Sequence, residues 1–397
     1  MHNYDVVVAG GSVSGLFAAR EIAISGFKVC VLEEDHEIGT PEHCGGVISM
    51  TGLNELGILP SIKSAYADIK EAEISSLNHK FTVSAKNQKV LIIDRREFDK
   101  QIAFQAQRNG ADIKTMCRVI SINHNDKNIS SNNPQNIGSD DKHNFIIKTN
   151  NEIFSSKFFI DARGISSLIQ TNRKGVLLSA QYEIYSKNFE SDKIRIKFDS
   201  VRFPGFFAWV IPTGHGKAKV GVAGNAINVV PTIKRYLDEI CSSYSTIRKI
   251  FAPIWVAGPT PSFIRGRYVI VGDAAGQTKP TTAGGIYSCG MGGILAGRSI
   301  SQYLHGHEEK LFDYEKNWFS KFGSEFEKML LFRKLIERLD NRAIDKIFDT
   351  ISKSNLDEIS NSTDFDFHSS AISKILGIKG ITKILNALVG NELRRIF

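Results

Sequence analysis

The stretch that decides the fold is Asp5–Glu33, DVVVAGGSVSGLFAAREIAISGFKVCVLE. Apolar residues at Asp5–Val8 predict a strand, the glycine-rich Ala9–Gly15 predicts a turn, and the residues up to about Ser25 predict a helix. A second strand follows at Lys28–Leu32. Such a β-α-β unit is typical of dinucleotide-binding proteins, although a glycine-rich turn can also serve only to pack a helix tightly against a strand.

The turn carries the features that a dinucleotide needs. The pattern G-x-G-x-x-G falls on Gly10, Ser12 and Gly15, with serine in place of the middle glycine. The first N–H groups of the helix, around Ser14, and the helix dipole favour a pyrophosphate at this point. Glu33 ends the second strand about 20 residues further on, where an acid accepts hydrogen bonds from a ribose. We therefore expect these five residues to bind a dinucleotide cofactor.

Composition describes a globular chain with a basic surface. The length of 397 residues predicts two or three domains, and 42% hydrophobic and 23% charged residues are typical of a globular protein. The formal net charge is +8. A basic surface fits nucleic acid, an anionic membrane or a phosphate-bearing ligand. Because the sequence has no zinc-finger, helix-turn-helix or RNP-like motif, we expect no nucleic-acid partner.

The cysteines and histidines suggest neither disulfides nor a metal. The five cysteines form no C-x-x-C pair, and their odd number predicts free thiols in a reducing compartment. The histidines show no ligand spacing, so no metal site is expected. The strand begins almost at the first residue, so we expect no signal peptide and a cytoplasmic location.

The segments after the opening unit predict both strands and helices. Alternating apolar residues between Ala72 and Ile93 predict antiparallel strands, and the periodic stretch from Arg95 to the cap at Gly110 predicts a helix. Short strands are expected at Asp112–Met116, Arg118–Asn123, Phe145–Thr149 and Lys157–Ile160. The polar stretch 123–144 cannot bury enough apolar surface to order itself, so it predicts a mobile hairpin excursion.

Residues 175–224 predict one antiparallel sheet, followed by a helix over Pro231–Tyr244. A short strand is expected at Tyr268–Val271, and the uncharged stretch 280–297 after it is too glycine-rich for a membrane span, which favours a buried helix. Beyond His305 the chain is expected to be helical. Its basic, amphipathic tail favours a helix packed by one face, with membrane contact as the alternative.

Several motifs, in this order and spacing, resemble one superfamily, the FAD-dependent hydroxylase-like flavoproteins. GDAA at 272–275 follows a buried strand and precedes a glycine-rich helix, as in that superfamily. The resemblance implies FAD as the cofactor. It also implies a role for each of five matching residues: Asp273 at the ribityl chain, the helix start at Gly285 and Ile286 at the flavin pyrimidine edge, Arg95 in holding FAD, and the backbone of Val119 near the adenine.

Two further stretches are similar to the geranylgeranyl reductase family. Pro41–Gly45 matches its P-x-x-C-G loop, and FAWVIP at 207–212 resembles its Y-x-W-x-F-P motif. The likeness implies that Cys44, Gly45 and Val47 lie beside the flavin, with Cys44 as the candidate catalytic residue. The alternative for Cys44 is a small buried side chain in a tight loop. The likeness to the family further implies that Phe206, Phe207 and Trp209 line the substrate site. These aromatic residues could equally belong to the core of the sheet.

The sequence departs from the family at four places besides Ser12. Gly46-Val47 replaces a common Glu-Gly, Phe207 and Ile211 replace Tyr and Phe, and Arg163 replaces the second acid of a D-A-D-G turn. These changes affect the substrate assignment more than the binding of FAD.

The resemblance implies an α/β fold with a Rossmann-like FAD-binding domain, an antiparallel-sheet substrate domain and a C-terminal helical region. We expect the first from 1–70, 91–165 and 266–305, the second from 71–90 and 166–265, and the third from 306–397. The implied activity is FAD-dependent reduction of double bonds in geranylgeranyl chains of phospholipid precursors. NADPH or ferredoxin would be the electron donor, and contact with the membrane would be peripheral. An aromatic-type FAD monooxygenase and a non-catalytic prenyl-binding escort of the same fold are the alternatives.

Overall fold

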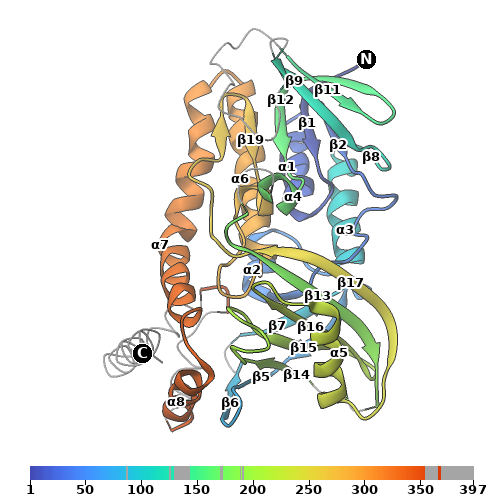
Figure 1. The fold of residues 1–397 in the computed structure, drawn as a ribbon. Coiled ribbons are helices and arrows are strands. Elements are labelled where there is room, and N and C mark those ends of the chain that lie inside the picture. Colours follow the sequence, from blue (N-terminus) through green and yellow to red (C-terminus); the bar gives the residue numbers. More distant parts are fainter. Residues whose placement is uncertain are drawn as a thin grey trace.

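The computed structural model describes residues 1–85, 88–124, 127–128, 144–169, 173–187, 189, 192–353 and 365–367. Within these residues the chain forms two large sheets and one small sheet, with helices packed on their faces (Figure 1). Most of the stretch 123–144, and the amphipathic tail after residue 367, lie outside the described residues.

The first sheet is built around β1 (His2–Ala9), which lies between β2 (Val29–Leu32) and β12 (Ile153–Asp161). All three strands are parallel, and β8 (Asp112–Lys114) extends the sheet in the same direction beyond β2. The short β19 (Tyr268–Ile270) runs parallel to the end of β12. Because the residues of β2 and of the second half of β1 are buried on both faces, these strands form the centre of an α/β layer.

Shorter antiparallel strands complete this sheet. They are β9 (Val119–His124), β10 (Lys127–Asn128), β11 (Phe145–Thr149) and β18 (Ile264–Arg265). The mixed sheet and its first β-α-β unit confirm the predicted Rossmann-like fold class.

Two helices pack closely against each other beside the first sheet (Figure 1). The helix of the opening unit, α1 (Val13–Ile24), packs along α6 (Ile286–Leu304). Glycines at 290, 293 and 297 make this close approach, and a Cβ at Gly293 would lie 2.1 Å from a backbone oxygen of α1. The uncharged stretch 280–297 is therefore a buried helix only from Ile286 onward, and its first residues form a loop.

A small layer lies between the two large sheets. It contains β3 (Val47–Ser49), β4 (Ala65–Ile69) and β7 (Val90–Ile93), together with α2 (Met50–Glu55). The next helix, α3 (Arg95–Arg108), packs against α1. The carboxylate of Asp94 caps α3 by accepting the N–H of Arg96, so β7 passes directly into the helix.

The second sheet is antiparallel except for one parallel pair, β14 and β5. In spatial order its strands are β17 (Ser245–Trp255), β13 (Val176–Tyr185), β16 (Lys217–Gly224), β15 (Ala208–Gly214), β14 (Lys193–Lys197), β5 (Glu71–Ser75) and β6 (Lys80–Ser84). The helix α5 (Val229–Ile240) covers its outer face (Figure 1), burying Ile233, Tyr236 and Leu237.

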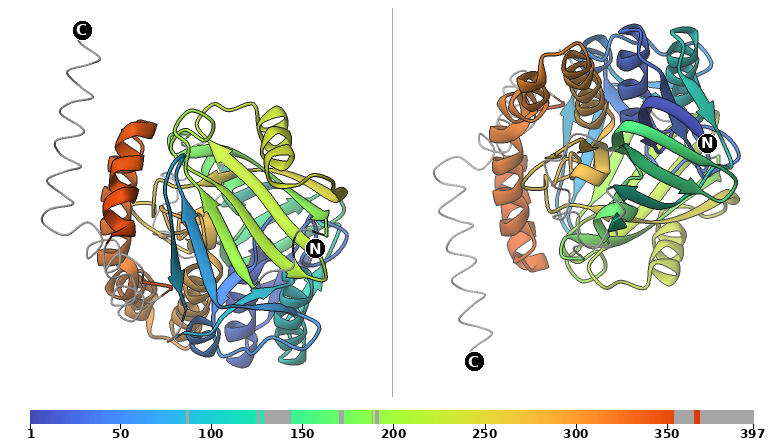
Figure 2. Two further views of the ribbon diagram at one scale, coloured as in Figure 1. Left: turned by 90° about the horizontal axis from the view of Figure 1, so that it is seen from below. Right: turned by 90° about the horizontal axis from the view of Figure 1, so that it is seen from above.

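Three short helical segments join these layers. They are α4 (Ile165–Ile169), the 3-10 turn η2 (Gly272–Ala275) and the 3-10 turn η3 (Glu308–Phe312). The long α7 (Asp313–Ile336) then runs beside α6 (Figure 2), and α8 (Asn341–Ser352) packs against β6. Residues beyond 305 are therefore helical as far as Ser352.

Several elements differ from the sequence-based expectation. The helix predicted over 231–244 ends at Ile240, and the chain then forms the eleven-residue strand β17, which was not predicted. The strand β4 was also missed. The proposed division into three regions remains a prediction.

Candidate FAD site

The turn between β1 and α1 requires glycine at two positions, Gly10 and Gly15. Gly10 has φ +111°, and a Cβ there would lie 2.2 Å from the carbonyl oxygen of Ala162. A Cβ at Gly15 would lie 2.1 Å from the carbonyl oxygen of Gly10. Ser12 is the N-cap residue of α1, but its side chain makes no capping hydrogen bond, and the first turn contains no acid. The helix start therefore presents backbone N–H groups and a positive dipole end, which suit a pyrophosphate.

The hydroxyl of Ser12 points to α3 instead. Its Oγ accepts a hydrogen bond from Nη2 of Arg95 at 3.0 Å and donates to Oδ2 of Asp99 at 3.2 Å. Arg95 also donates two hydrogen bonds to Asp99, each 2.8 Å long. Burial lowers the pKa of Arg95, but Asp99 and the thiol of Cys44 together outweigh burial, and the pKa is raised. The departure at Ser12 thus links the glycine turn to a charged Arg95, the residue predicted to hold FAD.

Glu33 lies at the end of β2 and faces the same turn. Its Oε2 accepts the N–H of Gly11 at 2.6 Å, and its Oε1 accepts the N–H of Asp35 at 3.0 Å. Burial raises the pKa of this carboxyl, against the effect of those two hydrogen bonds. The N–H of Cys117 donates to the carbonyl oxygen of Glu33 at 2.7 Å, so the chain just before β9 and Val119 lies beside the end of β2.

The η2 turn brings residues 272–275 next to the start of α1. Gly272 has φ +70°, and a Cβ there would lie 2.3 Å from Oγ of Ser14. The carboxylate of Asp273 is exposed and accepts a hydrogen bond from Thr278 at 2.9 Å. A Cβ at Gly285 would lie 3.5 Å from that carboxylate, so Asp273 and the start of α6 at Gly285 and Ile286 are neighbours.

The residues present fit FAD. Two glycine-rich helix starts, those of α1 and α6, have neither an acidic residue in the first turn nor a side-chain cap. The contact between Gly272 and Ser14 connects them, and the charged Arg95 lies beside the first. An elongated group with a pyrophosphate near its middle and an electron-rich ring at one end matches this arrangement.

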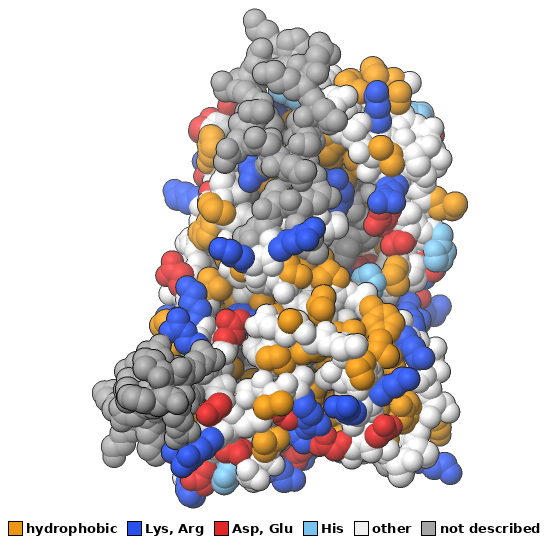
Figure 3. Space-filling model, viewed as in Figure 1, with side chains coloured by type: hydrophobic (Ala, Val, Ile, Leu, Met, Phe, Trp, Pro, Cys, Tyr) orange, Lys and Arg blue, Asp and Glu red, His pale blue; other side chains and the backbone are white. Residues whose placement is uncertain are grey.

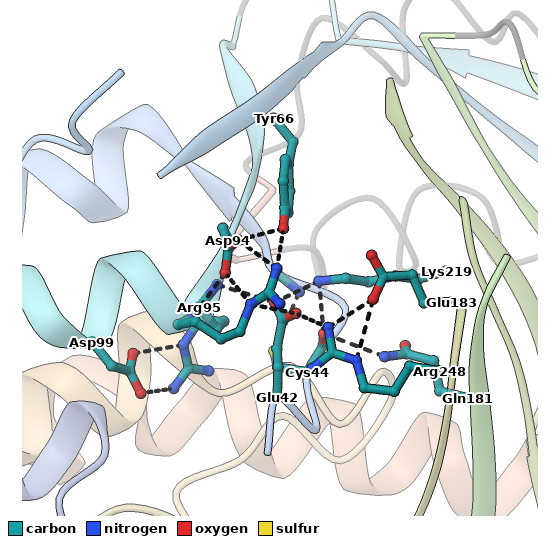
Figure 4. A network of polar contacts seen from close by, with 12 residues as sticks. Glu42, Cys44, Tyr66, Asp94, Arg95, Asp99, Gln181, Glu183, Lys219 and Arg248 are labelled. Atoms are coloured by element: carbon teal, nitrogen blue, oxygen red, sulfur yellow. Dashed lines mark hydrogen bonds and ion pairs between the residues drawn. The ribbon is translucent and has the colours of Figure 1, made fainter. Parts of the chain in front are cut away.

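The loop with Cys44 is attached to the inner face of the seven-stranded sheet (Figure 4). The carbonyl oxygen of Cys44 accepts hydrogen bonds from Nζ of Lys219 at 3.2 Å and from Nε2 of Gln181 at 3.4 Å. Gln181 in turn accepts the indole N–H of Trp209 at 3.0 Å. A Cβ at Gly45 would lie 2.7 Å from the side chain of Ile211, so the loop lies directly on β15.

A buried carboxylate fixes this loop. Oε1 of Glu42 accepts hydrogen bonds from Lys219 at 2.6 Å and from the N–H of Arg95 at 3.0 Å. Its Oε2 is buried and has no hydrogen-bond donor among the described residues, but it lies 3.6 Å from Arg248 and 3.9 Å from Arg96 (Figure 4). Three cations therefore surround one carboxylate at the junction of the two large layers.

The thiol of Cys44 faces its own loop. Its Sγ accepts the N–H of Gly46 at 3.3 Å. Gly46 has φ +80°, and a Cβ there would lie 2.2 Å from the carbonyl oxygen of Ile93, so this position needs glycine. The loop then enters β3 at Val47.

Aromatic side chains cover the inner face next to the loop. Phe206 and Phe207 are stacked, with ring centroids 4.1 Å apart, and Trp209 meets both rings edge-on. Trp209 lies flat over Gly221, where a Cβ would lie 2.2 Å from the indole ring. Ala283, just before Gly285, packs against the same cluster, so the predicted substrate residues reach the loop at the start of α6.

Sequence reasoning missed the polar residues that join the two layers. They are Glu42, Gln181, Lys219 and Arg248. One signal was present for Glu42, which lies inside the P-x-x-C-G loop. For Lys219 the signal was a charge at an inward position of a strand whose other residues after Lys217 are all buried.

None of the five cysteines forms a disulfide. Among the described residues, no group of three or more His, Cys, Asp or Glu side chains could hold a metal ion. The helices of the described part of the chain are all too short or too polar to cross a membrane.

Comparison with known proteins gives relatives over almost the whole chain. The model of the FAD binding domain family matches residues 3–229. Digeranylgeranylglycerophospholipid reductase 2 of Methanothermobacter thermautotrophicus is 27% identical over 90% of this chain and 94% of its own length. The digeranylgeranylglycerophospholipid reductase of Thermoplasma volcanium is 26% identical over 91% and 94%.

Solved structures share the fold. A geranylgeranyl bacteriochlorophyll reductase-like protein of Thermoplasma acidophilum has a TM-score of 0.82 at 23% identity, covering 97% of this chain and all of its own. The p-nitrophenol 4-monooxygenase of Pseudomonas putida has a TM-score of 0.68 at 17% identity, covering 93% and 98%. The chain therefore belongs to the FAD binding domain family, as an FAD-dependent oxidoreductase whose relatives in sequence include geranylgeranyl-lipid reductases.

Proposed function

We propose that this protein reduces the double bonds of geranylgeranyl chains in phospholipid precursors. One observation carries the proposal: Gln181 and Lys219 tie the Cys44 loop to the sheet that bears Trp209. The resemblance assigns the loop to the flavin and the strand to the substrate, and these contacts make them neighbours. The names of the relatives support the substrate class.

Reduced FAD, when bound, supplies a hydride to an isolated alkene that no carbonyl polarises. The chain's own residues must then hold the alkene in position and exclude water. The stacked Phe206 and Phe207, with Trp209 across their edges, form an apolar aromatic surface that suits an isoprenoid chain.

Cys44 is our candidate for holding the proton that the second alkene carbon receives, or for placing the chain. Its Sγ accepts the N–H of Gly46, so the thiol hydrogen is not used in that bond. Glu42 and Lys219 fix the loop around it. Full turnover by an FAD-loaded Cys44→Ala variant would remove this role.

We also propose that the protein works in the cytoplasm, in peripheral contact with an anionic membrane. Apolar side chains gather over β13 and β17 (Figure 3), where Leu178 is 48% and Phe251 is 52% exposed. Register pairs Phe251 with Ala180, so Leu178, Phe251 and the exposed Lys249 share one face of the sheet. A cation beside half-exposed apolar side chains suits a surface of acidic lipids.

The test is to supply reduced FAD-loaded protein with a digeranylgeranyl glycerophospholipid and follow the lipid by mass spectrometry. Each reduced bond adds the mass of H2. NADPH or ferredoxin would provide the electrons in the cell. Consumption of dioxygen and NADPH on addition of an aromatic acid would instead indicate a monooxygenase, and binding of the lipid without a gain in mass would indicate an escort.

A further inference from the structure

A short segment near the end of the chain, Phe365–Phe367, is built into the interior. Asp366 is 5% exposed, and its Oδ1 lies 3.2 Å from Nζ of Lys279, which is 6% exposed. Asp366 also accepts a hydrogen bond from the hydroxyl of Ser49. Removing one member of such a buried pair leaves an unpaired charge in the interior, so the loss of either Asp366 or Lys279 should be costly.

The two partners of Asp366 belong to the candidate site. Ser49 ends β3, the strand that follows the Cys44 loop. Lys279 lies in the turn between η2 and α6, where its N–H donates to the carbonyl oxygen of Gly284 at 3.0 Å. Asp366 thus connects the strand after Cys44 with the loop that leads to Gly285.

The two phenylalanines of the segment pack in different places. Phe367 stacks on Phe322 of α7, with ring centroids 5.8 Å apart, and meets Tyr287 edge-on. Phe365 is half-buried and packs against the apolar cluster between the small layer and the second sheet, which is formed by Ile69, Val90, Ile92, Ile194 and Ile211.

That cluster is continuous with the candidate substrate site. Trp209 and Val47 pack against it as well. The N–H of Phe365 donates to Oε1 of Gln88 at 2.7 Å, and its carbonyl oxygen accepts from Lys279 at 3.3 Å, so both sides of its backbone are fixed. The half-buried ring of Phe365, whose centroid lies 5.0 Å from Nζ of Lys279, therefore packs against the same apolar cluster as Trp209 of the surface assigned to the isoprenoid.

We propose that Phe365 is a specificity-determining residue of the apolar chain site, forming the wall that limits chain length, and that the Asp366–Lys279 pair positions it. The proposal rests on the proposed substrate class, an isoprenoid lipid. A longer chain would meet the ring, whereas a shorter chain would leave part of the ring uncovered.

The test is binding, measured on the full-length, FAD-loaded protein with glycerol ethers of farnesyl, geranylgeranyl and a longer prenyl chain. In Phe365→Ala, the ratio of the affinity for the longest chain to the affinity for the geranylgeranyl chain should rise by about tenfold. One additional apolar group in a shaped pocket changes binding by about this factor. The exposed Phe312→Ala should leave the ratio unchanged. Asp366→Asn should shift the ratio in the same direction as Phe365→Ala.

An unchanged ratio in Phe365→Ala, with FAD content intact, would overturn the proposal even if Asp366→Asn fails to fold. Dissociation constants do not depend on turnover. Failure of the proposed reduction would therefore appear as binding without a gain in mass, and failure of the Phe365 proposal as an unchanged ratio of dissociation constants.

Discussion

Nζ of Lys219 lies 2.6 Å from Oε1 of Glu42, in a place where the two side chains are 2% and 1% exposed. Glu42 comes from the loop that carries Cys44, and Lys219 comes from β16 in the middle of the second sheet. The pair therefore couples the position of Cys44 to the sheet that carries Trp209.

Replacing Lys219 by Met should destabilise the fold strongly, because the buried carboxylate of Glu42 would lose its nearest cationic hydrogen-bond donor. We expect a loss of about 3–5 kcal/mol in the free energy of unfolding, measured in urea. Lys80→Met, which breaks the exposed pair with Glu73, should cost less than about 1 kcal/mol. Equal effects of the two substitutions would contradict this account of the buried pair.

Replacing Gly221 by Ala should displace Trp209, because the added Cβ would lie 2.2 Å from its indole ring. We expect weaker binding of the isoprenoid by about tenfold, with FAD content unchanged and a shifted tryptophan fluorescence. Gly323→Ala in α7 is the control, since its nearest side-chain atom would be 3.5 Å away. The substrate role of Trp209 is wrong if its fluorescence shifts while substrate binding does not change.

Arg95→Met should lower the affinity for FAD by at least about tenfold, since it removes a charged donor beside the glycine turn. The matched substitution Arg108→Met, at the exposed far end of α3, should have no effect on the dissociation constant of FAD. Ser12→Gly, which restores the common glycine, should retain FAD. Retention of normal FAD affinity by Arg95→Met would remove Arg95 from the site.

Lowering the pH should reduce the free energy of unfolding through Asp94, which lies between the small layer and α3. Burial raises the pKa of Asp94, but Arg96 and Tyr66 outweigh burial and hold it at about 2, below the ordinary 3.8. The unfolded chain therefore binds the proton first, so the stabilisation is complete above pH 3.8 and is lost as pH falls toward 2. Asp94→Asn should make the urea concentration at the unfolding midpoint depend less on pH between pH 5 and 2.5 than it does in the unaltered protein. The exposed Asp238→Asn should leave this pH dependence unchanged. The same pH dependence in both variants would contradict this assignment.

Phe251→Asp should reduce binding to vesicles of phosphatidylglycerol by roughly tenfold, because a half-exposed apolar ring is replaced by an anion. Turnover of detergent-dispersed lipid should stay the same. Phe104→Asp on α3 is the control, since Phe104 is 64% exposed but lies on a different layer. Equal losses in both variants would show that the β13–β17 face has no special role.

The sequence pattern within single stretches of the chain was enough to predict the opening β-α-β unit and α3. The apolar runs of β1 and β2, the glycine turn at Gly10 and Gly15, and the periodicity of α3 each lie within one stretch of chain. The strand β17 was missed because Arg248 and Lys249 interrupt its apolar pattern directly after a helix. Its identity as a strand is decided by pairing with β13, about 70 residues earlier.

The contacts of the candidate site depend on tertiary structure. Glu42 meets Lys219 from a position 177 residues away, and Asp366 meets Ser49 from 317 residues away. No periodicity encodes such pairs, since the two partners of each pair lie in distant stretches of the chain. Motif resemblance identified Cys44 and Trp209 but not Gln181, which lies between them.

The most direct measurement of the central claim is the mass of a digeranylgeranyl glycerophospholipid after incubation with the FAD-loaded, chemically reduced protein. The account predicts that the lipid gains the mass of H2 for each saturated bond. Protein that keeps its FAD but is left unreduced, and reductant without protein, should produce no gain. An unchanged lipid mass with fully loaded, reduced protein that binds the lipid would contradict the claim that this chain is a geranylgeranyl-lipid reductase.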